Sequence, residues 1–238
     1  MYTFDSRIRY SETDSEGKLT LDALLNYFQD SSTFQSEELD VGISYMRRNN
    51  LVWVLSAWQI VVERYPRLGE EVVIGTFPYD FKGFIGLRNF VMMTKEGEYL
   101  AKANSLWSLL STESNKPTLP TAEMLAKYPL EDKLEMDYAP RKIAIPENGA
   151  TEVPIVVKKH HIDTNHHVNN GQFVNMAMEY LPEGFSIRQM RAEYRMQAFL
   201  NDELYPYVAR AEEGYVVVLR NQQDKPYVVV EFTGKESV

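Results

Sequence analysis

The chain of 238 residues contains no cysteine. This excludes a disulfide framework and a cysteine nucleophile, and it fits the reducing cytoplasm. Long apolar runs are also missing, because none approaches the roughly 18–20 residues of a membrane-spanning helix. The start, MYTFDSRIRYSETD, lacks the basic and apolar regions of a secretory signal and carries acids that transit peptides avoid. With a net charge of −9, we expect a cytoplasmic protein that binds neither nucleic acid nor membrane.

Histidine is scarce, and its distribution is uneven. All four histidines, His160, His161, His166 and His167, lie in the stretch HHIDTNHHVNN at residues 160–170. The following sequence, GQFVNMAMEYL, has apolar residues at helical spacing. We therefore expect the polar cluster at a helix N-terminus, where unpaired N–H groups and the helix dipole stabilise negative charge.

Asp163 and Asn165 lie among these histidines. An imidazole, a carboxylate to orient it and an amide to hold water or a carbonyl oxygen form an acid–base set without a nucleophile. A purely structural alternative makes Asp163 the helix N-cap, pairs Asn169 and Asn170 with first-turn amides, and leaves the histidines in a solvated loop. A metal site is a third alternative, although no usual spacing of zinc ligands occurs.

Two runs of predicted elements follow the same order of strand, polar turn, helix and several strands. The first predicts a strand at 3–10, a helix at 19–39 with Thr20 as its cap, and strands at 51–66, 67–81, 84–94 and 99–112. The second predicts a strand at 152–160, a helix at 168–181, and strands at 187–199, 203–213, 215–223 and 226–235. Residues 112–154 hold six of the eleven prolines, which indicates a connection, with a short helix at 121–128.

The two runs indicate an internal repeat. A shift of 149 residues places Asp14 on Asp163 and Leu19 on Val168. In each run, the simplest way to bury one amphipathic helix is to wrap an antiparallel sheet around it. We therefore predict an α+β protein of two tandem hot-dog units, with an N-terminal unit at 1–111, a proline-rich linker at 112–152 and a C-terminal unit at 153–238. The first turn, SETDSEG, lacks histidine, so we assign the chemistry to the second unit.

Four motifs carry a family resemblance: RYSETD with ALLNYFQD near the start, WVLSAW at 53–58, D-x-N-x-HVNN at 163–170, and EYRMQAF at 193–199. Together they resemble the acyl-acyl-carrier-protein thioesterases, double hot-dog hydrolases that release fatty acids from carrier protein in plants and bacteria. The resemblance covers nearly the whole chain. It implies a site at Asp163, Asn165 and His167, no cofactor and no metal, and acyl carrier protein and a fatty acyl thioester as partners.

One position departs from the plant members of that family. They carry a glutamate three residues after the tyrosine of E-Y-R-R-E, and the matching residue here is Gln197. A glutamine cannot act as a base, although its amide can position a water molecule. We include Gln197 in the predicted site as a supporting residue. Glu193, the nearest acid, is expected roughly 13 Å away along the strand.

The predicted reaction is hydrolysis of fatty acyl-acyl carrier protein in fatty acid biosynthesis. His167 takes a proton from the attacking water, Asp163 orients His167, Asn165 holds water or the carbonyl, and first-turn N–H groups stabilise the oxyanion. An alternative assignment, in which Asp163 is the base or nucleophile and His167 positions it, fits the same residues. Two alternative functions stay open: a thioesterase acting on coenzyme A esters, and a non-catalytic acyl-binding double hot-dog protein that Gln197 would favour.

Two further surfaces follow from the resemblance. The family places its acyl chain between helix and sheet of the N-terminal unit, where Phe28, Trp53 and Trp58 supply bulk, although a plain core explains these aromatics equally well. An acidic carrier protein needs basic groups near the pocket mouth. The candidates near the motif are Lys158, Lys159, Arg188, Arg191 and Arg195, with a solvated charged face as the alternative. The sequence leaves the oligomeric state open, a homodimer included.

Overall fold

The structure, a computed structural model, describes residues 1–163 and 165–236. Thr164, inside the predicted motif, lies outside the described residues. By its internal contacts the chain divides into two compact units, one of residues 1–56 and 62–138, the other of residues 57–61 and 139–238. The second unit thus takes a short piece of the first half of the sequence.

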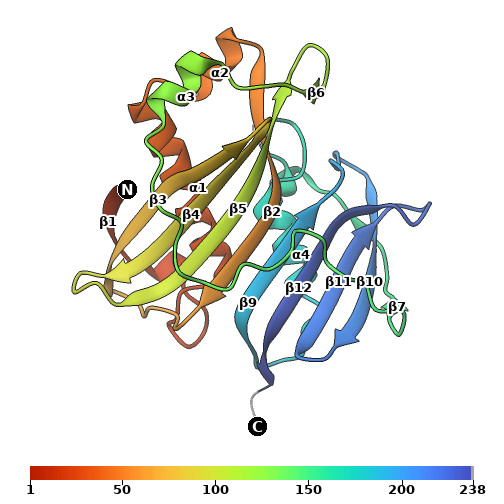
Figure 1. Ribbon diagram of the computed structural model, residues 1–238. Helices are drawn as coiled ribbons and strands as arrows, with labels where there is room; N and C mark the ends of the chain where they lie inside the picture. Colours follow the sequence, from red (N-terminus) through yellow and green to blue (C-terminus); the bar gives the residue numbers. More distant parts are fainter. Residues whose placement is uncertain (164, 237–238) are drawn as a thin grey trace. The chain divides into compact units, whose positions relative to one another are not determined.

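The first unit is an antiparallel sheet with one long helix (Figure 1). Its strands are β1 (Tyr2–Arg7), β2 (Leu51–Val62), β3 (Glu71–Lys82), β4 (Ile85–Thr94), β5 (Tyr99–Ser111) and the short β6 (Lys116–Pro117). They lie in the order β1-β3-β4-β5-β2, with β6 beside β5. The helices are α1 (Leu21–Glu38), α2 (Ile43–Arg48) and α3 (Ala122–Lys127).

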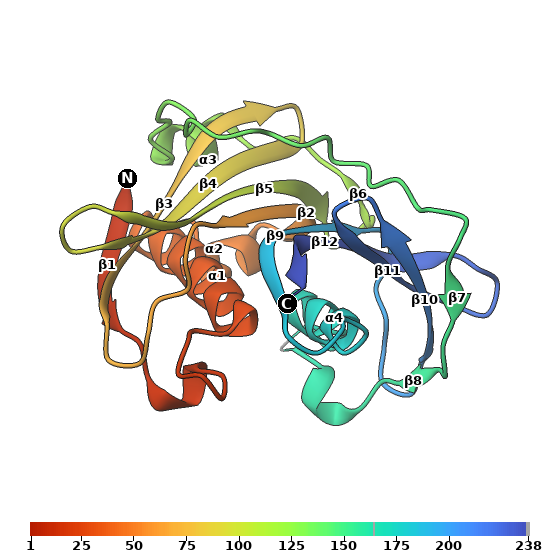
Figure 2. The same cartoon turned by 90° about the horizontal axis from the view of Figure 1, so that it is seen from below.

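Helix α1 begins and packs as its sequence predicts. The Thr20 side chain accepts a hydrogen bond from the Ala23 N–H at 3.2 Å, which satisfies one free first-turn amide. The apolar stripe that includes Leu25 and Phe28 is buried, and the Phe28 ring lies 5.4 Å from that of Phe90 in β4. Figure 2 shows α1 inside the curve of β3, β4 and β5. The predicted wrapping of a sheet around this helix is confirmed.

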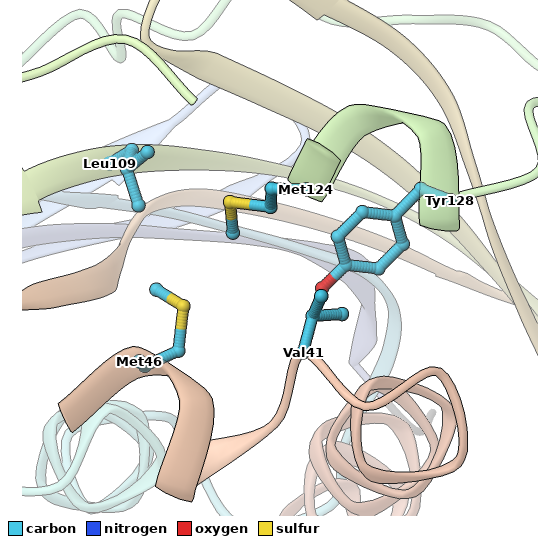
Figure 3. Packing of buried hydrophobic residues seen from close by; sticks show 5 residues of the cluster. All are labelled: Val41, Met46, Leu109, Met124 and Tyr128. Carbon is cyan, nitrogen blue, oxygen red and sulfur yellow. The ribbon is translucent and has the colours of Figure 1, made fainter. Parts of the chain in front are cut away.

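A smaller hydrophobic cluster lies beyond the end of α1. Figure 3 shows its buried members, Val41, Met46, Leu109, Met124 and Tyr128. The cluster brings together α2, which the sequence analysis missed, and the predicted short helix α3. Part of the proline-rich segment is therefore built into the first unit by apolar burial.

The second unit repeats the plan with α4 (Asn170–Met178) as its helix. Its strands are β7 (Ala150–Thr151), β8 (Ile155–Val156), β9 (Phe185–Tyr194), β10 (Glu203–Ala211), β11 (Gly214–Arg220) and β12 (Pro226–Glu236). The order is β9-β12-β11-β10-β7, and β8 pairs with β10. Residues 57–61 of β2 pair antiparallel with β9. Figure 2 shows α4 inside the curve of this sheet.

The outer side of this second sheet is also covered. Ile143, from the proline-rich segment, packs with Val216, Val218 and Val229. Strand β11 is therefore apolar on both faces, which explains its continuous run YVVVL. The strand predicted at 152–160 is reduced to the two residues of β8, because Pro154 cannot donate to a ladder and a 3-10 helix follows at once.

Candidate active site

The turn that carries the predicted residues joins the 3-10 helix Lys159–His161 to α4. A β-bridge between Ile162 and Val168 closes its two ends. Between them, the Asp163 N–H donates to the His167 carbonyl at 2.9 Å. The backbone thus holds the two main candidates, four residues apart, at the base of one tight loop.

Side chains and an unusual dihedral complete the turn. The Asp163 carboxylate accepts from the Asn165 N–H at 2.8 Å, a local bond that aspartate favours in turns. Asp163 therefore serves the turn and does not cap α4, whose cap is Asn169. His166 has φ +66°, and Gly17, its counterpart 149 residues earlier, has φ +72°. His166 therefore occupies a backbone position that favours glycine.

Asp163 and His167 form the central pair of the site. The Asp163 Oδ2 lies 3.6 Å from the His167 Nδ1, and their side chains are 19% and 23% exposed. The Asn165 amide lies 3.5 Å from the same carboxylate oxygen. The His167 Nδ1 also faces the Val168 carbonyl at 3.4 Å. Since protein groups occupy the Nδ1 side of the ring, Nε2 is the nitrogen available for proton transfer.

The first turn of α4 has fewer free donors than the sequence predicted. The Asn169 side chain accepts from the Gly171 N–H at 2.8 Å, and its carbonyl accepts from the N–H groups of Gln172 and Phe173 at 3.0 and 3.3 Å. Among the described residues, the Asn170 N–H has no hydrogen-bond acceptor. It is therefore the first-turn donor available for an oxyanion.

The segment that follows β9 brings Gln197 to this turn. The Val168 N–H donates to the Ala198 carbonyl at 2.8 Å, so Gln197 precedes a residue bonded directly to the loop that carries His167. The Gln197 side chain is exposed.

The first unit has the same arrangement. There the Leu19 N–H donates to the Pro66 carbonyl at 2.8 Å, and Tyr65 takes the place of Gln197. Burial, and the negative charge of Asp14, raise the pKa of the Tyr65 hydroxyl. The Tyr65 hydroxyl therefore lies close enough to Asp14 to be affected by its negative charge. In the second unit, the matching backbone bond brings Ala198, the neighbour of Gln197, to the loop that carries His167.

Glu193 has a structural role. Burial acts to raise the pKa of its carboxyl, but hydrogen bonds from the Arg195 guanidinium and the Ile143 N–H lower it below its usual range. The two bonds measure 2.9 and 3.1 Å. This carboxylate links the proline-rich segment to β9. It therefore does not take the place of the family's glutamate, whose position is occupied here by Gln197.

The basic candidates divide into two groups. Arg191 pairs with Glu231 at 2.7 Å and donates to the Pro140 carbonyl at 2.5 Å, and Arg195 pairs with Glu193. Lys158, Lys159 and Arg188 are exposed. Arg195 is exposed as well, but its guanidinium is engaged by Glu193, so Lys158, Lys159 and Arg188 are better placed to receive an acidic surface.

The aromatic residues predicted near an acyl chain are largely core. Phe28 and Trp58 are buried, and Trp53 is half-buried beside Phe81 at a ring distance of 6.1 Å. Trp58 lies in the β2 segment that belongs to the second unit. Burial of this kind fits a hydrophobic core as well as a closed pocket.

Among the described residues, the structure contains neither a metal-binding cluster nor a membrane-spanning helix. Within residues 1–163 and 165–236, no three histidine, aspartate or glutamate side chains are grouped so as to hold a metal ion. In the same residues, no helix has both the length and the hydropathy for crossing a bilayer.

Comparison with known proteins gives a consistent picture. The family model described as the acyl-ACP thioesterase N-terminal domain matches residues 1–128, and the C-terminal domain model matches residues 146–218. A chloroplastic acyl-[acyl-carrier-protein] hydrolase of Cuphea viscosissima is 22% identical over 92% of this chain and 60% of its own length. A palmitoyl-acyl carrier protein thioesterase of Gossypium hirsutum is 23% identical over 80% of this chain and 50% of its length. The chain thus spans only 50–60% of the length of these curated relatives.

Solved structures show the same fold. An acyl-ACP thioesterase from Bacteroides thetaiotaomicron superposes with a TM-score of 0.90 at 21% identity, covering 98% of this chain and 97% of that one. A 12:0-ACP thioesterase from Umbellularia californica gives a TM-score of 0.86 at 18% identity, covering 99% and 97%. The predicted α+β double hot-dog fold is confirmed.

Proposed function

This chain belongs to the acyl-ACP thioesterase family, and we propose that it hydrolyses the thioester of a fatty acyl group carried on acyl carrier protein. The observation that carries the proposal is the Asp163–His167 pair, with Oδ2 and Nδ1 3.6 Å apart at the start of α4. It supplies a base with a fixed ring orientation beside a helix N-terminus, the two parts that thioester hydrolysis needs.

The proposed reaction starts with water. Its oxygen bonds to the thioester carbonyl carbon while the His167 Nε2 accepts its proton. The carbonyl oxygen becomes an oxyanion facing the Asn170 N–H. When the tetrahedral intermediate collapses, the carbon–sulfur bond breaks, and the departing thiolate takes the proton back from His167. The products are a fatty acid and the free thiol of the carrier.

The hydrogen bonds favour His167 over Asp163 as the base. One Asp163 oxygen accepts the Asn165 N–H, and the other faces His167 and the Asn165 amide. A carboxylate engaged on both oxygens is suited to orienting the imidazole and stabilising its charged form. Asn165 and Gln197 are then left to position water or the carbonyl.

The test is a panel of acyl-carrier-protein and acyl-coenzyme A esters, from short to long chains. Wild type is compared with Asp163→Ala and His167→Ala, and with His160→Ala as a control at an exposed histidine outside the site. We expect His167→Ala to lower the rate about 10²–10⁴-fold and His160→Ala to leave it unchanged. A loss under tenfold in a folded His167→Ala protein would remove the residue from the role of base.

The same panel separates the alternatives. Hydrolysis of coenzyme A esters alone would identify a different carrier. Tight acyl binding without turnover would favour the acyl-binding protein, which is motivated by the amide of Gln197 in place of a carboxylate. A cytoplasmic location and a homodimer remain predictions from the sequence.

A further inference from the structure

His161 makes contacts that a solvated loop residue would not make. Its Nδ1 accepts a hydrogen bond from the Lys158 N–H at 3.0 Å. Its carbonyl accepts from the Asn169 N–H at 2.9 Å. The first bond closes the 3-10 helix before the catalytic turn, and the second ties that helix to the cap of α4. One residue therefore links the segments on both sides of Asp163 and His167.

The first unit makes the same two bonds with a different side chain. There the Arg9 N–H donates to the Glu12 Oε2 at 2.8 Å, and the Thr20 N–H donates to the Glu12 carbonyl at 2.9 Å. Glu12 and His161 are 149 residues apart, as are the two 3-10 helices. Both an imidazole and a carboxylate can accept a hydrogen bond from a backbone N–H. The position therefore requires an acceptor.

We propose that His161 is a positioning residue of the hydrolase, whose imidazole Nδ1 holds the turn in the geometry that sets Asp163 against His167. The proposal rests on the proposed function. It requires neutral His161 with its proton on Nε2, because a protonated Nδ1 would place a donor against the Lys158 N–H. His161 does not touch the substrate. It acts through the backbone of the turn.

The surroundings of His161 favour the neutral form. Its ring lies 4.1 Å from that of His160. Burial, then the positive charges of His160 and Lys158, lower the pKa of His161. The third neighbour, the α4 cap Asn169, carries no charge. Because the pKa is lower in the folded than in the unfolded protein, this bond stabilises the turn above about pH 6.5 and is lost as the pH falls through the folded value.

The experiment compares two substitutions. His161→Gln keeps a neutral acceptor on a side chain shaped like Glu12, and His161→Leu removes the acceptor. We expect His161→Leu to lower kcat roughly 10- to 100-fold, the effect of displacing catalytic groups by about 1 Å, with KM changed less than about twofold. His161→Gln should retain kcat within about threefold. Equal rates for the two folded variants would overturn the proposal.

A matched control separates catalysis from stability. Glu12→Leu removes the same bond from the first unit, where the turn carries no histidine. It also removes the hydrogen bond from the Tyr27 hydroxyl and the ion pair with Arg9, so it should lower the thermal midpoint at least as much as His161→Leu and leave kcat within about twofold. If Glu12→Leu lowers kcat as much, the role of His161 is only structural.

The pH profile adds a third measurement. At acid pH, protonation removes both the proposed base His167 and the acceptor on His161, so the acid limb of log kcat against pH in wild type should approach a slope of 2. In His161→Gln the slope should be 1. A slope of 2 that persists in His161→Gln would contradict the assignment of the second proton to His161.

An NMR measurement keeps this test independent of turnover. The chemical shifts of the His167 ring protons depend on the position of the ring relative to Asp163, so at one fixed pH they should be the same in wild type and His161→Gln and change in His161→Leu. If wild type hydrolyses no ester of the panel, the proposed function fails. The His167 chemical shifts then decide alone whether His161 positions the pair, and identical shifts in all three proteins would refute it.

Discussion

At the scale of single residues, the site is defined by how each polar atom is used. Both Asp163 oxygens have partners, and the His167 Nδ1 faces the protein. In the proposed reaction, the attacking water therefore has to meet Nε2. Gln197 is linked to this turn through the backbone of its neighbour Ala198. Its exposed side chain can therefore be substituted with little effect on the turn.

We expect Gln197→Glu to move the acid limb of the activity profile to higher pH. A second carboxylate near His167 stabilises the positively charged form of its imidazole. The profile of kcat/KM against pH measures this shift, and Gln197→Met serves as the uncharged control. An unchanged limb in the glutamate variant would show that the side chain at 197 lies too far from His167 to act on it.

His166 is expected to reduce stability. Its φ of +66° costs a residue with a side chain about 1 kcal/mol, a cost that glycine does not have. Glycine also makes the unfolded chain more flexible, which offsets part of this advantage. His166→Gly should therefore raise the free energy of unfolding by roughly 0.5 kcal/mol, measured in denaturant. The mirror substitution Gly17→His should lower it by a similar amount, roughly 0.5 kcal/mol, because space around Gly17 is open and only its φ opposes a side chain. A loss of stability in His166→Gly would indicate that the imidazole itself makes a favourable contact.

At the scale of elements, one helix packs inside the curved sheet of each unit. In the first unit, Gln35 of α1, Thr76 of β3 and Arg88 of β4 form a buried polar network. Arg88 is 8% exposed. It donates to the Gln35 side chain and to the Thr76 hydroxyl, the latter at 3.1 Å. Burial lowers the pKa of the Arg88 guanidinium to about 10, so it stays charged at neutral pH. Among residues 1–163 and 165–236 it forms no ion pair with a carboxylate.

A double-mutant cycle tests this network. Arg88→Met alone should lower the free energy of unfolding by about 1–3 kcal/mol, because it leaves the buried Gln35 amide without its donor. The pair Arg88→Met with Gln35→Met should be at least as stable as the wild type, since apolar side chains of similar size replace a buried charge and its partner together. Additive losses in chemical denaturation would mean that the two side chains are not coupled.

At the scale of the whole molecule, the net charge of −9 opposes the acidic carrier protein of the proposed reaction, so the proposed docking relies on local basic groups. Arg191 and Arg195 are held in ion pairs. Lys158 and Lys159 are exposed immediately before the catalytic turn. Attraction between exposed charges is screened over about 8 Å at physiological salt.

We expect Lys158→Glu with Lys159→Glu to raise KM for acyl-carrier substrates about tenfold and to leave kcat within about twofold. The rise of KM with salt concentration should also become weaker. Lys225→Glu, at an exposed lysine in the β11–β12 turn, is the charge-matched control and should change KM little. The docking proposal fails if the double variant keeps the wild-type KM and salt dependence.

The sequence by itself determined the repeated order of elements, the helix α1 with its cap, and the polar turn with Asp163, Asn165 and His167. These features follow from short-range rules: apolar spacing, capping preferences and turn chemistry act within a few residues. The helix cap Asn169 also follows from such a rule, although Asp163 competed for the same role in the sequence.

Only the tertiary structure decided which distant segments meet. It assigned residues 57–61 to the second unit, placed Ile143 over β11, and bonded Val168 to Ala198, the neighbour of Gln197. It also gave the Nδ1 of His161 a partner and used most of the first-turn amides. Local sequence patterns indicate which groups need a hydrogen bond or burial. The partner of each group is determined only by the complete fold, because all buried donors must be paired and all apolar faces covered at the same time.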